Sequence, residues 1–279
     1  MVFGKAVRSV KGKLPLISLI TDQFKTKRVV PALQLGDYMR VSSFAALCPR
    51  EEVLRSLHSV EKSDVVEPDL NLIFAHGTGL HYTLQNNVLP VLEVLYGQWT
   101  CLGCGLVHGS LSGSKPFTDV ICKRPYKCEH CTGTEFLFKE NFFINEEYHL
   151  TGHPDGFLKL PQYEGMGVLE AKSISPKGAW EVRNCPKMDH VIQAQIYCWM
   201  TGLKWSQILY WDKGTNGTAG LIEHHVERDD ETIAQVLEAV KSIWVGIESK
   251  TLPDRICATS DCPRAESCLV CAKCFTEAS

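Results

Sequence analysis

Alternating apolar and polar residues organise the middle of the chain. The alternation surrounds Asp155 in HLTGHPDGFLKL and returns across Val168 to Ser173, which predicts two strands joined by the turn-like PQYEGMG. Helical spacing follows from Pro186 to Gly202, where the glycine is a stop signal. Side chains two apart in a strand share a face, so Glu170 and Lys172 are expected to point the same way.

The C-terminal half continues this pattern. Trp205 to Lys213 and Gly220 to Val226 read as further strands, and Asp229 begins an amphipathic helix that reaches about Ser249. The inward side of this helix is expected to be Ile233, Val236, Leu237, Val240 and Ile243. These segments predict an α/β (α+β) fold, a mixed central sheet flanked by helices.

Two helices are predicted upstream of the sheet. Ser42-Ser43 would cap the first, which carries Phe44, Leu47, Cys48 and Leu54. The second would run from about Asp69 to Tyr96 and carries His81. Its expected inward residues are Ile73, Leu80, Leu84, Val88 and Leu92. The first forty residues are weakly periodic and lean basic, with Lys5, Arg8, Lys11, Lys13, Lys25, Lys27 and Arg28, and predict a surface arm or an edge that contacts DNA.

Composition limits the classes of protein. The 279 residues are 44% hydrophobic and 22% charged, with a net charge of −3, which argues against a protein that coats nucleic acid by charge alone. An enzyme with a local basic channel remains compatible with that total. No apolar run approaches a membrane span and the start lacks a signal peptide, so we expect a cytoplasmic protein that does not bind membranes.

Asp155, Glu170 and Lys172 are the candidate catalytic residues. Pairing of the two middle strands could bring Asp155 beside the other two, so that two carboxylates and a lysine converge. Hard oxygen ligands of this kind suit Mg²⁺ or Mn²⁺, and the lysine can orient a water or stabilise charge on a phosphate.

This arrangement resembles the PD-(D/E)XK nuclease superfamily, with its restriction-endonuclease-like fold. The motif is Gly152-His153-Pro154-Asp155 followed by Glu170-Ala171-Lys172. Four further residues resemble the RecB-like branch, which includes CRISPR-associated and phage recombination exonucleases. Gln193 and Tyr197 match its QxxxY signature, His81 its upstream metal-binding histidine, and Cys48 its first cluster cysteine.

The resemblance implies a DNA exonuclease. Asp155, Glu170 and His81 would hold one or two divalent ions, Lys172 would position the attacking water, and Gln193 and Tyr197 would orient Lys172 or contact DNA. The alternative for His81 is a core histidine. The implied substrate is DNA ends, mostly single-stranded, in repair, recombination, phage replication or CRISPR adaptation, and protein partners would come from recombination or CRISPR adaptation.

Two CxxC pairs mark an inserted module. Cys101, Cys104, Cys128 and Cys131 can supply four thiolates to a structural Zn²⁺. His108, Cys122 and His130 are spare donors. The segment between the pairs has almost no core, so metal binding would supply much of its folding energy. The module could be a brace or could touch DNA through Lys115, Lys123, Arg124 and Lys127.

The C-terminal tail forms a second cysteine group. Its members are Cys257, Cys262, Cys268, Cys271 and Cys274. Resemblance to the RecB-like branch implies a [4Fe–4S] cluster held by Cys48 and three of these five. The spacing departs from the usual order, which has a CxxC ahead of a five-residue gap. The sequence therefore does not identify which three of the five cysteines would be ligands. The alternative is a separate knuckle that binds a second Zn²⁺.

Five parts are expected along the chain: an arm (1–40), a helical part (41–98), the zinc module (99–135), the nuclease core (136–252) and the cysteine tail (253–279). Two other functions remain open at this stage. One is a structure-specific endonuclease, and the other is a zinc-containing DNA-binding protein with an inactive nuclease fold.

Overall fold

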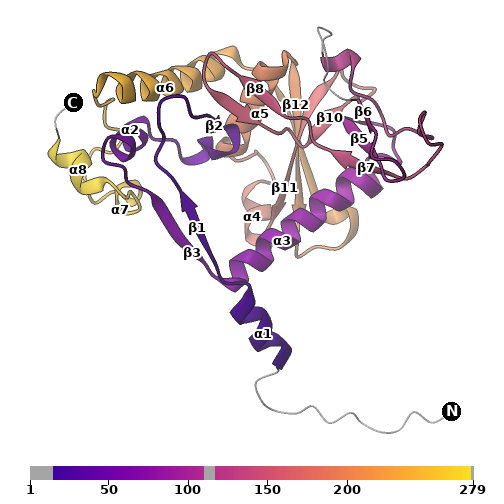
Figure 1. Cartoon of the computed structure of the whole chain (residues 1–279), viewed down its shortest axis with the longest axis horizontal. Coiled ribbons are helices and arrows are strands. Elements are labelled where there is room, and N and C mark those ends of the chain that lie inside the picture. Colours follow the sequence, from indigo (N-terminus) through magenta and orange to yellow (C-terminus); the bar gives the residue numbers. More distant parts are fainter. Residues whose placement is uncertain (1–14, 110–116, 278–279) are drawn as a thin grey trace.

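The computed structural model describes residues 15–109 and 117–277 and is built around a mixed five-stranded sheet (Figure 1). The strand order is β13-β12-β11-β10-β4. The strands are β4 (Leu95–Tyr96), β10 (Gly156–Leu158), β11 (Gly167–Ile174), β12 (Trp205–Asp212) and β13 (Leu221–Glu227). Within this sheet β11 and β12 pair in parallel, and the other neighbouring strands pair antiparallel. The predicted fold class, a mixed sheet flanked by helices, is confirmed.

A crossover of two helices joins the parallel pair. These are α4 (Pro176–Glu181) and α5 (Met188–Thr201), and Gly202 ends α5 in a left-handed conformation as the sequence predicts. Parallel strands need such a crossover, which covers a sheet face. With α6 (Asp230–Ser249), α5 packs on the side of Val168, while Leu169 and Ala171 enter a second core on the opposite face.

The predicted final helix is confirmed by α6. Asp229 caps it, its side chain accepting a hydrogen bond from the Glu231 amide at 3.0 Å. Ile233, Leu237, Val240 and Ile243 are buried, and Val236 packs partly buried beside them.

The first predicted helix is interrupted. A 3₁₀ helix, η1 (Val41–Ala46), precedes α2 (Pro49–Leu57), and Cys48 lies between them with extended φ and ψ of −124° and 106°. Proline disfavours a helical conformation in the residue before it. Cys48 is therefore at the N-terminus of α2 rather than within one continuous helix.

The second predicted helix is shorter than expected, and three of its five expected inward residues are exposed. Helix α3 (Pro68–Thr83) continues into a single π turn, η2 (Leu84–Val88), and the chain then turns at Pro90. Leu84 is buried, Leu80 is half-buried, and Ile73, Val88 and Leu92 are exposed. The apolar side of α3 borders a groove rather than a core. Periodicity shows that a helix face is apolar, but it does not show whether that face packs in a core or lines a groove.

Three small sheets surround the central one. In two of them β1 (Thr26–Val30) pairs with β3 (Lys62–Val66), and β9 (Leu150–Gly152) lies between β2 (Met39–Arg40) and β8 (Phe143–Asn145). The third, in the inserted module, places β5 (Gln98–Cys101) between β6 (Val107–His108) and β7 (Phe136–Lys139). The remaining short helices are η3 (Phe117–Asp119), η4 (Gly217–Gly220), α7 (Pro263–Glu266) and α8 (Cys271–Thr276).

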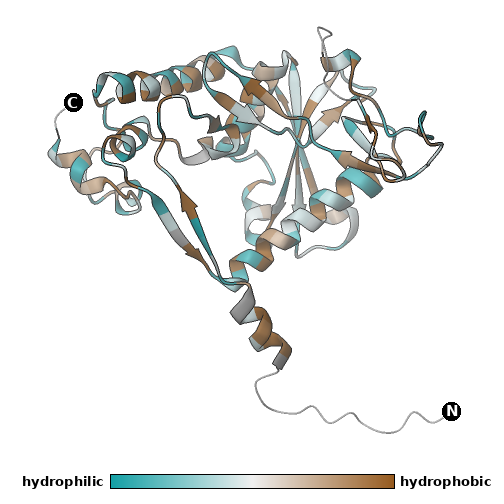
Figure 2. Cartoon of the chain, viewed as in Figure 1, coloured by the Kyte–Doolittle hydropathy of each residue, from teal (hydrophilic) through white to brown (hydrophobic). Residues whose placement is uncertain are grey.

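Helix α1 (Pro15–Gln23) projects from the body beside the start of α3 (Figure 1). Its ribbon is mostly hydrophobic in Figure 2, and Leu16, Ile17 and Leu19 are exposed. Lys5, Arg8, Lys11, Lys13 and Lys115 lie outside the described residues. None of the described helices is long and apolar enough to cross a membrane.

Candidate active site and cysteine clusters

Strand pairing brings Asp155 beside Glu170. In the antiparallel pair β10–β11, Gly156 is opposite Leu169, so the residues flanking this pair are Asp155 and Glu170. The Asp155 Oδ2 atom accepts a hydrogen bond from the Ala171 amide at 2.7 Å. This bond fixes one carboxylate oxygen and leaves Oδ1 to face the site.

Glu170 and Lys172 share a face of β11, as their spacing predicts. Lys172 Nζ lies 2.5 Å from Glu170 Oε1 and donates to Gln193 Oε1 at 3.1 Å. Glu170 is 1% exposed, and its Oε2 is buried without a hydrogen-bond partner in the described structure. A buried carboxylate oxygen without a donor is costly, and a cation would satisfy it.

The charges of this pair are strongly perturbed. Burial, and then the nearby charge of Asp155, raises the pKa of Glu170 to about 8, although Lys172 opposes the shift. Burial disfavours the charged lysine, but Glu170 and Asp155 outweigh it and raise the pKa of Lys172. In the metal-free site, burial therefore disfavours the ionised form of Glu170, while the neighbouring carboxylates favour the charged form of Lys172.

His81 and Glu140 complete a second donor set around Asp155. His81 Nδ1 lies 3.3 Å from Asp155 Oδ1, and donor atoms of His81, Glu140 and Asp155 all fall within 4.8 Å of one another. Gln85 Nε2 holds two of these residues, donating to Glu140 Oε1 and to the Asp155 carbonyl oxygen, both at 2.9 Å. The hydrogen bond to Asp155 raises the pKa of His81. One nitrogen and two carboxylate oxygens at this spacing fit a divalent cation.

Sequence reasoning missed Glu140. It directly follows β7, just after the inserted module and well before the Asp155 motif. Burial, and then Asp155, raises the pKa of this carboxyl group. Its local sequence resembles the start of an ordinary loop. Only the fold shows that Glu140 lies beside His81 and Asp155.

Gln193 and Tyr197 lie one turn apart on α5, facing this centre. Gln193 accepts the hydrogen bond from Lys172 described above. Tyr197 is 2% exposed, and burial raises its pKa. Its ring packs so closely on Gly152 that a Cβ there would overlap it. The structure therefore brings all six predicted residues, including His81, to one place.

The four cysteines of the inserted module form a compact thiol group. Cys101 Sγ lies 3.5 Å from Cys131 Sγ, Cys104 Sγ lies 3.7 Å from Cys128 Sγ, and all four fall within 4.8 Å of one another. Zinc–thiolate bonds of about 2.3 Å give a tetrahedral edge of about 3.8 Å. The four donors therefore fit one tetrahedral metal ion.

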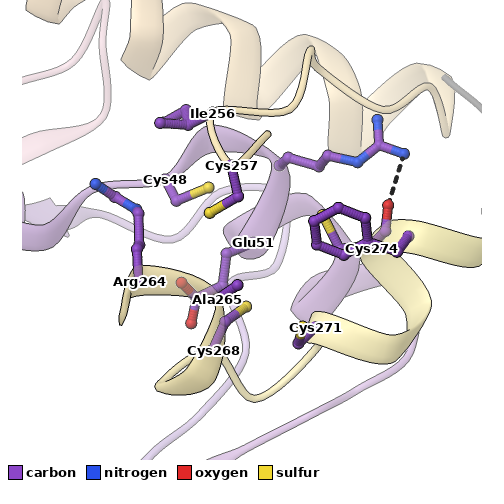
Figure 3. A pocket seen from close by; sticks show the side chains of 11 residues that line it. Cys48, Glu51, Ile256, Cys257, Arg264, Ala265, Cys268, Cys271 and Cys274 are labelled. Atoms are coloured by element: carbon purple, nitrogen blue, oxygen red, sulfur yellow. Dashed lines mark hydrogen bonds between the residues drawn. The ribbon is translucent and has the colours of Figure 1, made fainter. Parts of the chain in front are cut away.

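The tail cysteines gather against Cys48 (Figure 3). Cys48, Cys257, Cys268, Cys271 and Cys274 line one cavity, in which the sulfur atoms of Cys48 and Cys257 point toward each other. Cys262 is outside the lining. Its Sγ accepts a hydrogen bond from the Ala265 amide at 3.4 Å, and its contact with Cys257 raises the pKa of Cys257 to about 11.

These six thiols are spaced more widely than those of the module. Within residues 15–109 and 117–277, no three of their sulfur atoms lie within 4.8 Å of one another. A single tetrahedral ion needs donors closer than this, whereas a polynuclear cluster binds each thiolate to a different metal atom. The tail thiols are therefore not arranged as one tetrahedral site in the described structure.

Comparisons with known proteins give only distant likenesses. No protein-family model matches the chain, and no curated protein matches it. An alkaline exonuclease (LHK-Exo) from Laribacter hongkongensis has a similar crystal structure, with a TM-score of 0.46 and 14% identity over 77% of this chain and 89% of that chain. Its complex with dAMP gives a TM-score of 0.46 and 15% identity over the same shares. Similarity at this level concerns the path of the backbone and does not identify site residues.

Proposed function

We propose that the chain is a divalent-metal-dependent deoxyribonuclease of the PD-(D/E)XK type. The observation that carries this proposal is the convergence of Asp155, Glu170 and Lys172 with the His81 and Glu140 donors around one point. A hydrolase that stabilises charge on a phosphate needs this combination of oxygen donors and a held cation.

The donors divide into two sets that share Asp155. His81, Glu140 and Asp155 would hold one ion, and Asp155 with Glu170 would hold another. A divalent cation bound there would polarise the scissile phosphate and lower the pKa of the attacking water. Glu170 would bind such an ion in its ionised form, which burial disfavours in the metal-free site.

The chain itself supplies orientation and charge. Lys172 is held between Glu170 Oε1 and Gln193 Oε1, so its ammonium has a fixed direction before substrate arrives. From there it would position the water or stabilise negative charge on the phosphate. Gln193 orients Lys172 by accepting its hydrogen bond. Tyr197 packs against Gly152 and so supports β9 beside the site.

The orphaned Glu170 oxygen favours an active enzyme over an inactive DNA-binding protein. A buried carboxylate with one oxygen unpaired destabilises the fold unless a cation uses it. A decayed site would gain stability by losing this residue. We propose exonuclease action on DNA ends, in the DNA-processing settings that the sequence resemblance implies, with a structure-specific endonuclease as the alternative.

Two further metal sites are part of the proposal. Cys101, Cys104, Cys128 and Cys131 would hold a structural Zn²⁺. Cys48 and three of the five tail cysteines would hold a [4Fe–4S] cluster, because the fold brings Cys48 into one cavity with four of the tail thiols. A second Zn²⁺ in the tail is the alternative.

The decisive experiment compares the parent protein with Asp155→Ala and Glu170→Ala on linear, end-blocked and circular DNA. We expect at least a hundredfold loss of cleavage in both variants because each removes a metal donor. EDTA should stop the parent and excess Mg²⁺ or Mn²⁺ should restore it. Glu248→Ala, which removes an exposed carboxylate from α6, is the matched control.

Cleavage of linear DNA that ceases when its ends are blocked identifies an exonuclease, and cleavage of circles identifies an endonuclease. Retention of more than a few per cent of the activity by folded Glu170→Ala protein would rule out the assignment. Circular dichroism of each variant checks the fold.

A further inference from the structure

A groove leads along α3 to the candidate active site. Its walls come from α3 with the π turn η2 and from β7, and its floor includes the end of β11 and the residue after β12. Helix α3 crosses in front of β11 (Figure 1), and a Cβ at Gly77 would lie 3.1 Å from Ser173 Oγ. The groove lining is Ile73, Phe74, Gly77, Thr78, His81, Tyr82, Gln85, Asn86, Leu137, Phe138, Glu140, Ser173 and Lys213.

The groove exposes large apolar side chains that a folded core would normally cover. Phe74 is 49% exposed and Tyr82 is 52% exposed, and Ile73 and Leu137 are also exposed. Grouped exposed apolar residues in a concave surface mark a binding site. Two of the four are aromatic rings, which offer flat faces to a ligand.

The groove and the metal donors are continuous. His81 and Glu140 belong to both, so a ligand in the groove reaches the catalytic centre without leaving this surface. Phe74 and His81 are seven residues apart, two helical turns on the same side of α3, which corresponds to about 10 Å along the axis. A bound ligand that contacts Phe74 and extends along the groove therefore reaches His81.

The groove carries little positive charge, so recognition within it would depend on contacts other than those to phosphates. Histidine aside, Lys213 is the basic residue among the described lining residues, and the groove also contains Glu140. Duplex DNA presents mainly phosphates at its surface and depends on basic contacts. Unpaired bases present aromatic faces, and proteins that bind single strands stack them on exposed aromatic side chains.

We propose that unpaired bases of one DNA strand lie in this groove, stacked on Phe74 and Tyr82, and that they lead the scissile phosphate to the His81, Glu140 and Asp155 donors. The identification of the strand as DNA rests on the function proposed above. The site then selects single strands or frayed ends by the stacking surface beside it rather than by the metal donors.

Binding measured apart from cleavage tests this. Fluorescence anisotropy would use the full chain carrying Glu170→Gln, in Mg²⁺, with labelled oligonucleotides of one length. The three ligands are a single strand, a blunt duplex, and a single strand with abasic units at every position. We expect the normal strand to bind most tightly, and Phe74→Ala or Tyr82→Ala to weaken its binding by about tenfold each. Neither substitution should weaken the abasic strand.

Two matched variants serve as controls. Leu72→Ala removes another exposed apolar side chain from α3 that does not line the groove, and it should bind like the background protein. Phe74→Trp keeps a ring and should retain binding. Equal binding of the normal and abasic strands, tighter binding of the duplex, or unchanged binding by both alanine variants would overturn the proposal.

The two proposals fail in different ways. DNA cleavage by the parent, together with unchanged strand binding in both alanine variants, refutes the stacking groove and leaves the nuclease intact. Strand binding that depends on Phe74 and Tyr82, in a parent that cleaves no DNA, refutes the nuclease and leaves the groove intact.

Discussion

The burial of Glu170 lowers the stability of the folded chain, while the proposed metal binding needs this carboxyl group. Its side chain is almost fully buried, one oxygen contacts Lys172, and the other has no hydrogen-bond partner in the described structure. Burial disfavours the ionised form of this group, which is the form that binds a metal ion. Metal binding and folding therefore place opposite demands on one carboxyl group.

This conflict predicts a specific pH dependence of stability. In the unfolded chain the pKa of a glutamate is about 4.3, whereas in the folded, Mg²⁺-free protein that of Glu170 is about 8. Between these values the folded protein holds a proton that the unfolded chain has lost. The free energy of unfolding should therefore fall as pH rises toward about 8 and level off above it.

Glu170→Gln should flatten this dependence, since glutamine cannot titrate. Urea unfolding from pH 5 to 9, without Mg²⁺ or Mn²⁺ and with the thiolate metals left bound, measures it. Glu248→Gln, at an exposed position, should keep the slope of the parent. Parallel curves for the parent and Glu170→Gln would contradict the buried-carboxyl account.

At the scale of elements, β7 connects the inserted module to the catalytic centre. It pairs with β5 in a register that puts Cys101 opposite Phe136, and the Phe138 amide donates to Asn86 Oδ1 at 2.8 Å. Glu140 follows its last residue. The thiol group therefore anchors the strand that delivers a proposed metal donor, which favours a brace over a separate DNA-contacting ribbon.

Loss of the thiolates should therefore weaken metal use by the active site. Cys101→Ser combined with Cys128→Ser should remove one zinc per chain by elemental analysis and increase the Mg²⁺ concentration needed for half-maximal cleavage at least several-fold. Cys185→Ser, at an exposed cysteine outside both groups, should change neither quantity. Unchanged zinc content in the double variant would show that these cysteines hold no zinc.

At the scale of the whole molecule, hydrogen bonds connect the C-terminal tail to α2 and to the residue Leu47 just before it. Arg50 of α2 donates to the carbonyl oxygens of Pro253 at 2.8 Å and Glu277 at 2.7 Å, and Arg264 donates to the Leu47 carbonyl at 2.7 Å. The cysteine cavity lies between these contacts. A metal cluster here would close a loop of about two hundred residues and so constrain the unfolded chain strongly.

A cluster that spans the chain predicts a visible signature. Protein purified without oxygen should be brown, with broad visible absorption and roughly four irons per chain. Cys48→Ser should bleach it and lower the unfolding temperature, whereas Cys185→Ser should leave colour and iron unchanged. Colourless protein with a second zinc that survives Cys48→Ser would instead make the tail a separate knuckle.

Local sequence patterns were enough to predict which site residues share one strand face or one helix face. The two-residue repeat placed Glu170 and Lys172 on one face of β11, helical spacing placed Gln193 and Tyr197 one turn apart on α5, and the CxxC pairs marked the module thiols. Within one strand, one helical turn or one CxxC pair, the residues are near neighbours in sequence, so backbone geometry alone sets their relative positions.

Contacts between distant segments were decided by the tertiary structure. Glu140 joins the donors only because β7 ends beside Asp155, and the apolar face of α3 borders a groove because no layer among the described residues covers it. Cys48 likewise meets the tail through the packing of α2 against it. Periodicity states which face of a segment is apolar, but what that face meets depends on how the layers pack, and packing is a property of the whole chain.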